Sequence, residues 1–210
     1  DPFHHVSAQH RVQNAHCGSP SFLKSCMAVG AATVLNGAMS EKARTLFLLV
    51  IACAAGMCLW FMTAAILPDL VSDLGLSAAR QSALSSAVQA GFVVGALAIA
   101  ISGLADRVDP RGLFFAAALG SAATNAALLV VELDSNTAVG LRFLTGALMA
   151  GVYPVGMKIA VGWGTTDRGL LVGALVGALT FGKSVPYGLA WLGGADWRST
   201  IIVASAVAAL

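Results

Sequence analysis

Charged side chains are scarce in this sequence. Of its 210 residues only 10% are charged while 58% are hydrophobic, and the mean hydropathy is +0.82. A soluble domain carries about 25% charged residues, and so few charges cannot cover the surface of a globule of this length. The composition excludes a soluble enzyme, a nucleic-acid-binding protein and a disordered chain. We therefore expect an all-α, multi-pass membrane protein.

The first 38 residues lack the long apolar runs of the rest, and they hold all four histidines of the chain. At Met39 the composition changes to a short charged stretch, which an apolar segment follows at once. We expect Met39 to be the true start, residues 1–38 to be a non-native or disordered leader, and residues 39–210 to form the membrane domain. Two alternatives for the leader are a signal-peptide core over residues 26–39 and a metal site, whose spacing fits no standard pattern. The side chains of that metal site are His4, His5, His10, His16 and Cys17.

Long apolar runs joined by short loops fill the rest of the chain. A helix that crosses a bilayer needs about 20 mostly apolar residues, and none of these runs has a polar face that could meet water. The predicted spans are residues 46–68, 81–105, 113–133, 137–163, 169–193 and a truncated sixth span, 198–210. Pro154 interrupts the fourth span, and Gly91 and Gly95 are small residues suited to helix packing.

Basic residues in the loops predict the orientation of the spans. Five of them lie on the side of the N-terminus and two lie on the opposite side, which places the N-terminus in the cytoplasm. The short charged stretch that follows Met39 is typical of the start of a bacterial inner-membrane protein, so we expect a protein of the bacterial inner (plasma) membrane. The five are Lys42, Arg44, Arg107, Arg111 and Arg168, and the two are Arg80 and Arg198.

The turn after span two carries a recognisable motif. It reads Ser102-Gly103-Leu104-Ala105-Asp106-Arg107-Val108-Asp109-Pro110-Arg111. This resembles the cytoplasmic signature of the major facilitator superfamily, usually written Gly-x-Leu-Ala-Asp-Arg-x-Gly-Arg-Arg. The Leu-Ala-Asp-Arg core and the last arginine match, while Ser102, Asp109 and Pro110 depart from the pattern.

Three further stretches resemble the same family. Arg142-Phe143-Leu144-Thr145-Gly146 is similar to the Arg-x-x-Gln-Gly element that opens span four. The segment 151–158 is similar to the middle of span four in anion and organic-acid porters, and Asp196-Trp197-Arg198 is similar to a Trp-Arg pair before span six. The resemblance implies the six-helix N-terminal half of a twelve-helix transporter, built as two three-helix inverted repeats. The missing C-terminal half is then an expected partner.

Two cations lie inside the predicted spans, where a Lys or Arg costs about 2.5–3.5 kcal/mol on insertion scales. Lys183 lies near the middle of span five, about 10 residues from the nearer end. We predict that it binds substrate, and the alternative is a structural lysine paired with a carboxylate of the missing half. For Arg142 in span four, the resemblance implies substrate binding or proton coupling. Its alternative is an arginine that extends to the outer interface or binds backbone carbonyls.

Neutral polar side chains complete the predicted substrate site. Tyr153 and Tyr187 each adjoin a proline in the helices that carry the cations, and Gln89 lies within span two. Trp60 is a candidate wall of the same path. The alternative for each is a role in helix packing alone.

A second group of charges lies near the cytoplasmic end. By resemblance, Asp106, Arg107 and Arg111 form a cytoplasmic gate, and the alternative is that the two arginines serve only as anchors of membrane orientation. Lys158 also lies near that end of span four, where we expect it to extend to the interface.

The interior of the spans contains no acidic residue. Cations without carboxylates favour an anionic substrate, because guanidinium and ammonium groups bind oxyanions. We therefore predict a secondary active transporter of a small anion or organic acid that works by alternating access, with protons or a counter-ion. We expect no enzymatic activity, metal, cofactor or nucleic acid, and the absence of a Walker-type loop gives no support to ATP drive.

Three alternative functions remain open. They are efflux of drugs or amphipaths, a non-transporting membrane sensor, and an inert truncated fragment. Against efflux, the glycine signature that drug antiporters carry on span five is broken here at Ala178.

Overall fold

The computed structural model describes residues 41–164, 168–193 and 196–209, and every regular element in these ranges is a helix. Residues 45–210 form one compact unit. Five segments are long and apolar enough to cross a membrane: Lys42–Leu74, Ala78–Ser102, Pro110–Val130, Asn136–Trp163 and Arg168–Gly188. A shorter apolar helix, α10 (Trp197–Ala209), follows them. The prediction of an all-α membrane protein is confirmed.

The predicted leader over residues 1–38, both alternatives for it and Met39 lie outside the described residues. The division of the chain at residue 39 therefore stays a prediction.

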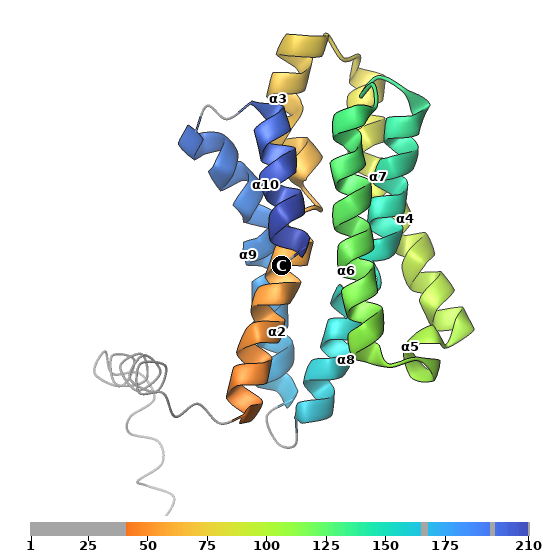
Figure 1. Ribbon diagram of the computed structural model, residues 1–210, viewed down its shortest axis with the longest axis vertical. Coiled ribbons are helices and arrows are strands. Elements are labelled where there is room, and N and C mark those ends of the chain that lie inside the picture. Colours follow the sequence, from red (N-terminus) through yellow and green to blue (C-terminus); the bar gives the residue numbers. More distant parts are fainter. Residues whose placement is uncertain (1–40, 165–167, 194–195, 210) are drawn as a thin grey trace, which may run out of the picture. The chain divides into compact units, whose positions relative to one another are not determined.

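Two of the membrane-spanning segments are interrupted (Figure 1). The first consists of α2 (Glu41–Met57) and α3 (Met62–Leu74), and the fourth consists of α7 (Asn136–Met149) and α8 (Tyr153–Trp163). Pro154 lies in the first turn of α8, where its missing N–H leaves no helical hydrogen bond unmade. The interruption of span four predicted from Pro154 therefore lies just before this proline, between α7 and α8.

The turn between spans two and three is set by local sequence. Helix α4 (Ala78–Ser102) ends at Gly103, whose φ of +62° is a conformation that favours glycine. After the short α5 (Leu104–Arg107), Asp109 Oδ2 accepts a hydrogen bond from the Gly112 amide over 2.8 Å and caps α6 (Pro110–Ala126). Span two therefore ends, and span three begins, three residues earlier than apolar length alone predicts.

Helices α4 and α7 form the closest pair in the bundle and lie side by side (Figure 1). A Cβ atom added to Gly91 would lie 1.9 Å from the carbonyl oxygen of Phe143, and one added to Gly146 would lie 1.9 Å from that of Val88. At Gly95 the corresponding distance to the Ala147 oxygen is 2.3 Å. The two backbones are therefore in direct contact, as small residues allow in membrane helices.

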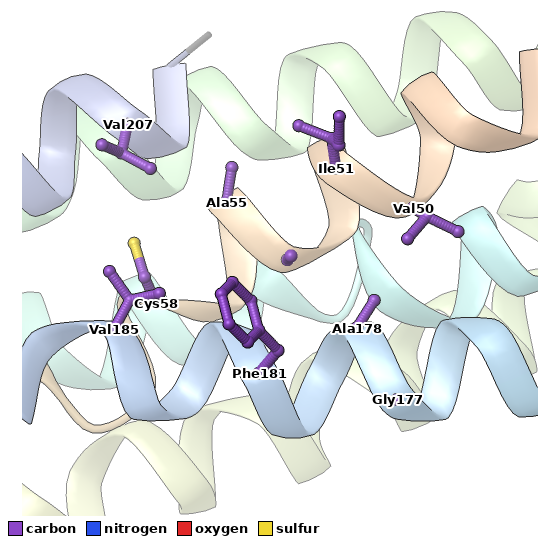
Figure 2. Close-up of a pocket in the computed structure, with 10 residues that line it drawn as sticks. Val50, Ile51, Ala55, Cys58, Gly177, Ala178, Phe181, Val185 and Val207 are labelled. Carbon is purple, nitrogen blue, oxygen red and sulfur yellow. The ribbon is translucent and has the colours of Figure 1, made fainter. Parts of the chain in front are cut away.

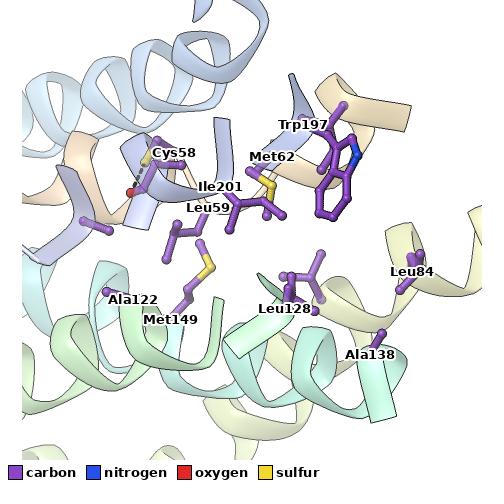
Figure 3. Close-up of a cluster of buried hydrophobic side chains, with 14 of the residues drawn as sticks. Cys58, Leu59, Met62, Leu84, Ala122, Leu128, Ala138, Met149, Trp197 and Ile201 are labelled. Carbon is purple, nitrogen blue, oxygen red and sulfur yellow. Dashed lines mark hydrogen bonds between the residues drawn. The ribbon is translucent and has the colours of Figure 1, made fainter. Parts of the chain in front are cut away.

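The main hydrophobic core surrounds the interruption of the first span (Figure 3). Helices α6, α7 and α10 contribute side chains to this core. The 3-10 helix η1 (Ala127–Val130) and the long α9 (Arg168–Gly193) complete the bundle. The fully buried members of the core include Met57, Leu59, Met62, Leu128, Met149 and Ile201. The segment that links α2 to α3 is thus held on its inner side by apolar packing.

Candidate functional site

Lys183 on α9 lies against the interruption of the first span. Its Nζ atom is 4.9 Å from the ring centroid of Trp60 and 5.7 Å from that of Phe61, both of which belong to the link between α2 and α3. Cation–π attraction operates over these distances. The side chain is half-buried, and no carboxylate in the described part of the chain forms an ion pair with it. Lys183 is therefore stabilised by aromatic rings rather than by a counter-charge.

Glycine allows α9 to come this close to the first span. A Cβ atom on Gly182 would lie 2.2 Å from the carbonyl oxygen of Ala54 on α2, so no larger residue fits there without separating the helices. Pro186, inside α9, has no N–H to donate to the carbonyl of Gly182 one turn earlier. The backbone beside Lys183 thus lacks one regular helical hydrogen bond and has a close neighbour.

Two further rings extend the cluster around Lys183. Tyr187, one turn further along α9, has its ring centroid 6.4 Å from that of Phe61. Phe92 on α4 stands edge-on to Trp60 with centroids 4.8 Å apart. The structure thus brings together Lys183 and Tyr187, two of the predicted site residues, with Trp60 as the predicted wall.

Phe61 and Phe92 are members of this cluster that sequence reasoning missed. Residues 57–62 contain neither glycine nor proline, so nothing in the sequence marked an interruption there. The only available signal was the tryptophan itself, in the middle of an apolar run.

Arg142 on α7 is fully buried and lies on the backbone side of the same link. Its Nη2 atom donates hydrogen bonds to the carbonyl oxygens of Leu59 (3.2 Å) and Trp60 (3.3 Å), and its Nη1 donates to Asn125 Oδ1 (3.1 Å). Asn125 Nδ2 in turn donates to Ser205 Oγ on α10 over 2.9 Å. This network joins four membrane segments through one guanidinium.

All described partners of Arg142 are neutral, and its Nε atom has none. Carbonyl oxygens left free by the interrupted helix supply the acceptors that a buried cation needs. This is the contact expected if Arg142 binds backbone carbonyls, and its role toward substrate or protons stays a prediction.

Tyr153 and Gln89 lie elsewhere on the bundle. Tyr153 begins α8 and packs, half-buried, against the hydrophobic core. Gln89 is exposed on α4, one turn before Phe92. Neither makes a hydrogen bond or ring contact with Lys183 among the residues that the structure describes, so their roles also stay predictions.

An ion pair lies at the end of the bundle where α5 is found (Figure 1). Lys158 Nζ on α8 is 2.5 Å from Asp106 Oδ1, and it also donates a hydrogen bond to the carbonyl of Ala105. The hydrogen bond and the charge of Lys158 lower the pKa of Asp106 below the usual range of an aspartate. Arg107 and Arg111 are exposed and form no ion pair in the described ranges.

An apolar cavity of about 430 Å³ opens between α2, α9 and the end of α10 (Figure 2). Its walls include Ile51, Cys58, Phe181 and Val207 and carry no charged side chain. None of the predicted site residues lines it. A wholly apolar cavity offers an anion no partner, so the candidate site is the cation and its rings.

The sequence model of the Major Facilitator Superfamily matches residues 48–210, which include the interruption of the first span, Lys183 and the motif around Asp106. The chain belongs to the Major Facilitator Superfamily. It is therefore a multi-pass membrane protein of a transporter family, and the resemblance to this superfamily as a whole is confirmed. No curated protein and no solved structure matches the chain. In the three-plus-three arrangement that the Major Facilitator Superfamily motifs imply, the two interrupted segments, spans one and four, occupy equivalent places.

Proposed function

We propose that this chain is part of a secondary active transporter of a small organic acid or other small anion, and that Lys183 binds the anionic group. One observation carries the proposal. The ammonium group lies half-buried in the middle of a membrane helix, against two aromatic rings, with no carboxylate partner in the described spans. A charge in that place needs a counter-charge or water, and an anionic substrate supplies the counter-charge.

The second buried cation strengthens the case for an anion. Because Arg142 is bound only by neutral groups, it adds positive charge to the interior that nothing in the described spans cancels. A cationic drug would be repelled by this field, which disfavours the efflux alternative. Tyr187 lies on the same face of α9 as Lys183 and is the first candidate for a second polar contact. Tyr153 and Gln89 remain further candidates along the path.

The remaining steps of transport follow the family pattern in this proposal. Transport proceeds by alternating access, coupled to protons or to exchange of a counter-ion, without enzymatic chemistry. Asp106, Arg107 and Arg111 act as the cytoplasmic gate, together with a second helical half of the same protein. The protein lies in the inner (plasma) membrane with its N-terminus in the cytoplasm.

Uptake by the full-length protein in proteoliposomes tests the proposal. We expect saturable uptake of one or more radiolabelled organic acids, and at least a tenfold loss of affinity in Lys183→Met. Lys183→Arg, which keeps the charge, should retain part of that affinity. The matched control is Arg198→Gln, which removes an exposed cation stacked on Trp197 and should leave affinity unchanged. Absence of anion uptake together with saturable efflux of a cationic dye would overturn the proposal.

A further inference from the structure

Aromatic rings gather around Lys183 from three parts of the chain. Trp60 and Phe61 come from the link between α2 and α3, Phe92 from α4 and Tyr187 from α9, and ring contacts of 4.8 Å and 6.4 Å connect them in pairs. Aromatic residues make up only 7% of the chain. Two rings at a membrane-embedded cation, each in contact with a further ring, are therefore a specific arrangement rather than a result of composition.

The rings and the ammonium group are only partly covered. Tyr187 is 47% exposed, and Trp60, Phe61, Phe92 and Lys183 are half-buried. Cation–π contacts use the charge of Lys183 but leave its three N–H groups without an oxygen acceptor among the described residues. The same small region thus offers hydrogen-bond donors with a positive charge and open aromatic surface.

We propose that the substrate is an aromatic carboxylate, an inference that rests on the proposed function. Its carboxylate pairs with the Lys183 ammonium group while its planar ring packs among Trp60, Phe61 and Tyr187. Aromatic pairs prefer offset-stacked or edge-to-face geometry, which a planar ring satisfies and a puckered saturated ring does not. Lys183 then supplies affinity for the charge, and the rings supply selectivity for the body of the substrate.

Two acids of similar size separate these contributions. Benzoate and cyclohexanecarboxylate carry the same carboxylate on a six-membered ring, and the saturated ring is the more hydrophobic. Binding of each to the purified full-length protein in lipid nanodiscs, measured by calorimetry, should give a Kd at least tenfold lower for benzoate. Lys183→Met should raise the Kd of both acids.

Substitutions in the cluster test the role of the rings. Phe61→Leu and Tyr187→Leu should each reduce the benzoate preference, measured as the ratio of the two Kd values, to less than threefold. Because Tyr187 is exposed, its replacement spares the core, and Tyr187→Phe is the matched control that keeps the ring and should keep the preference. Melting temperatures equal to the parent's would establish that the variants are folded.

The outcomes distinguish this inference from the proposed function. Equal affinities for the two acids, or a benzoate preference that survives both leucine substitutions, would overturn the aromatic inference and leave organic-acid transport standing. Binding of aliphatic acids alone would overturn it in the same way. Failure of organic acids and of small inorganic anions alike to bind would overturn both.

Discussion

The guanidinium group of Arg142 donates a hydrogen bond to the carbonyl oxygen of Trp60 over 3.3 Å. The ring of the same tryptophan lies 4.9 Å from Lys183 Nζ. One residue of an interrupted helix therefore contacts a fully buried cation through its backbone and a half-buried cation through its side chain. By fixing the backbone, Arg142 positions the ring that Lys183 contacts.

Replacing Arg142 by methionine should lower the free energy of unfolding by about 1–3 kcal/mol, because Leu59, Trp60 and Asn125 would lose their buried donor. The buried thiols of Cys53 and Cys58 allow a direct measurement. A thiol-reactive dye reports their exposure on heating, in a background where Cys17 and Cys26 are replaced by serine. Arg111→Gln, at an exposed position, is the control. An Arg142→Met variant with the same melting temperature as the parent would show that the hydrogen-bond network of Arg142 does not stabilise the fold.

Replacing Gly91 by alanine should separate α4 from α7, because the new Cβ would meet the Phe143 carbonyl at 1.9 Å. Overpacking of this kind costs about 1–3 kcal/mol. Gly140→Ala on α7 is the matched control, since nothing lies within 4 Å of its Cβ position. The same thermal assay should show a lower melting temperature for the first variant and an unchanged or higher one for the second. Equal effects of the two substitutions would contradict the close helix contact.

The Asp106–Lys158 pair should persist through neutral and mildly acidic pH. Because the contact lowers the pKa of Asp106 in the folded protein, its stabilisation is present above the ordinary aspartate pKa, about 3.9, and is lost only as the pH falls through the lowered value. A spin label attached to Leu104→Cys, in α5, should become more mobile as the pH falls through this lowered pKa.

Removing the lysine should shift this transition. In Lys158→Gln the pKa of Asp106 should return toward its ordinary value, so the label should become mobile at higher pH. In Asp106→Asn the label should show no transition in the acidic range. Identical transitions with and without Lys158 would refute the assigned contact.

The predicted orientation can be measured with cysteines at opposite ends of the bundle. A membrane-impermeant maleimide should label Thr137→Cys in intact cells, and it should label Val108→Cys only after permeabilisation. Both positions are exposed, so a difference in labelling reports sidedness rather than burial. The reverse pattern would place the N-terminus outside.

Local sequence properties predicted the spans well, because hydrophobicity accumulates along each run irrespective of its neighbours. Helix ends were predicted less well, since Gly103 and the Asp109 cap act through backbone conformation rather than apolar length. The interruption at residues 58–61 could not be predicted at all. Arg142, which donates hydrogen bonds to the carbonyls of the interruption, lies 82 residues from Trp60 in the sequence. The contacts that define the ring cluster therefore arise only in the folded chain.

Gly182 and Lys183 are adjacent but differ in what they tolerate. A side chain at Gly182 would collide with the Ala54 carbonyl, whereas Lys183 reaches beyond the helix contact to half-open rings. The helix contact therefore depends on the glycine and does not depend on the side chain at position 183. In the proposed function Lys183 binds the anion, so libraries for altered uptake should be randomised at that position while the glycine is kept.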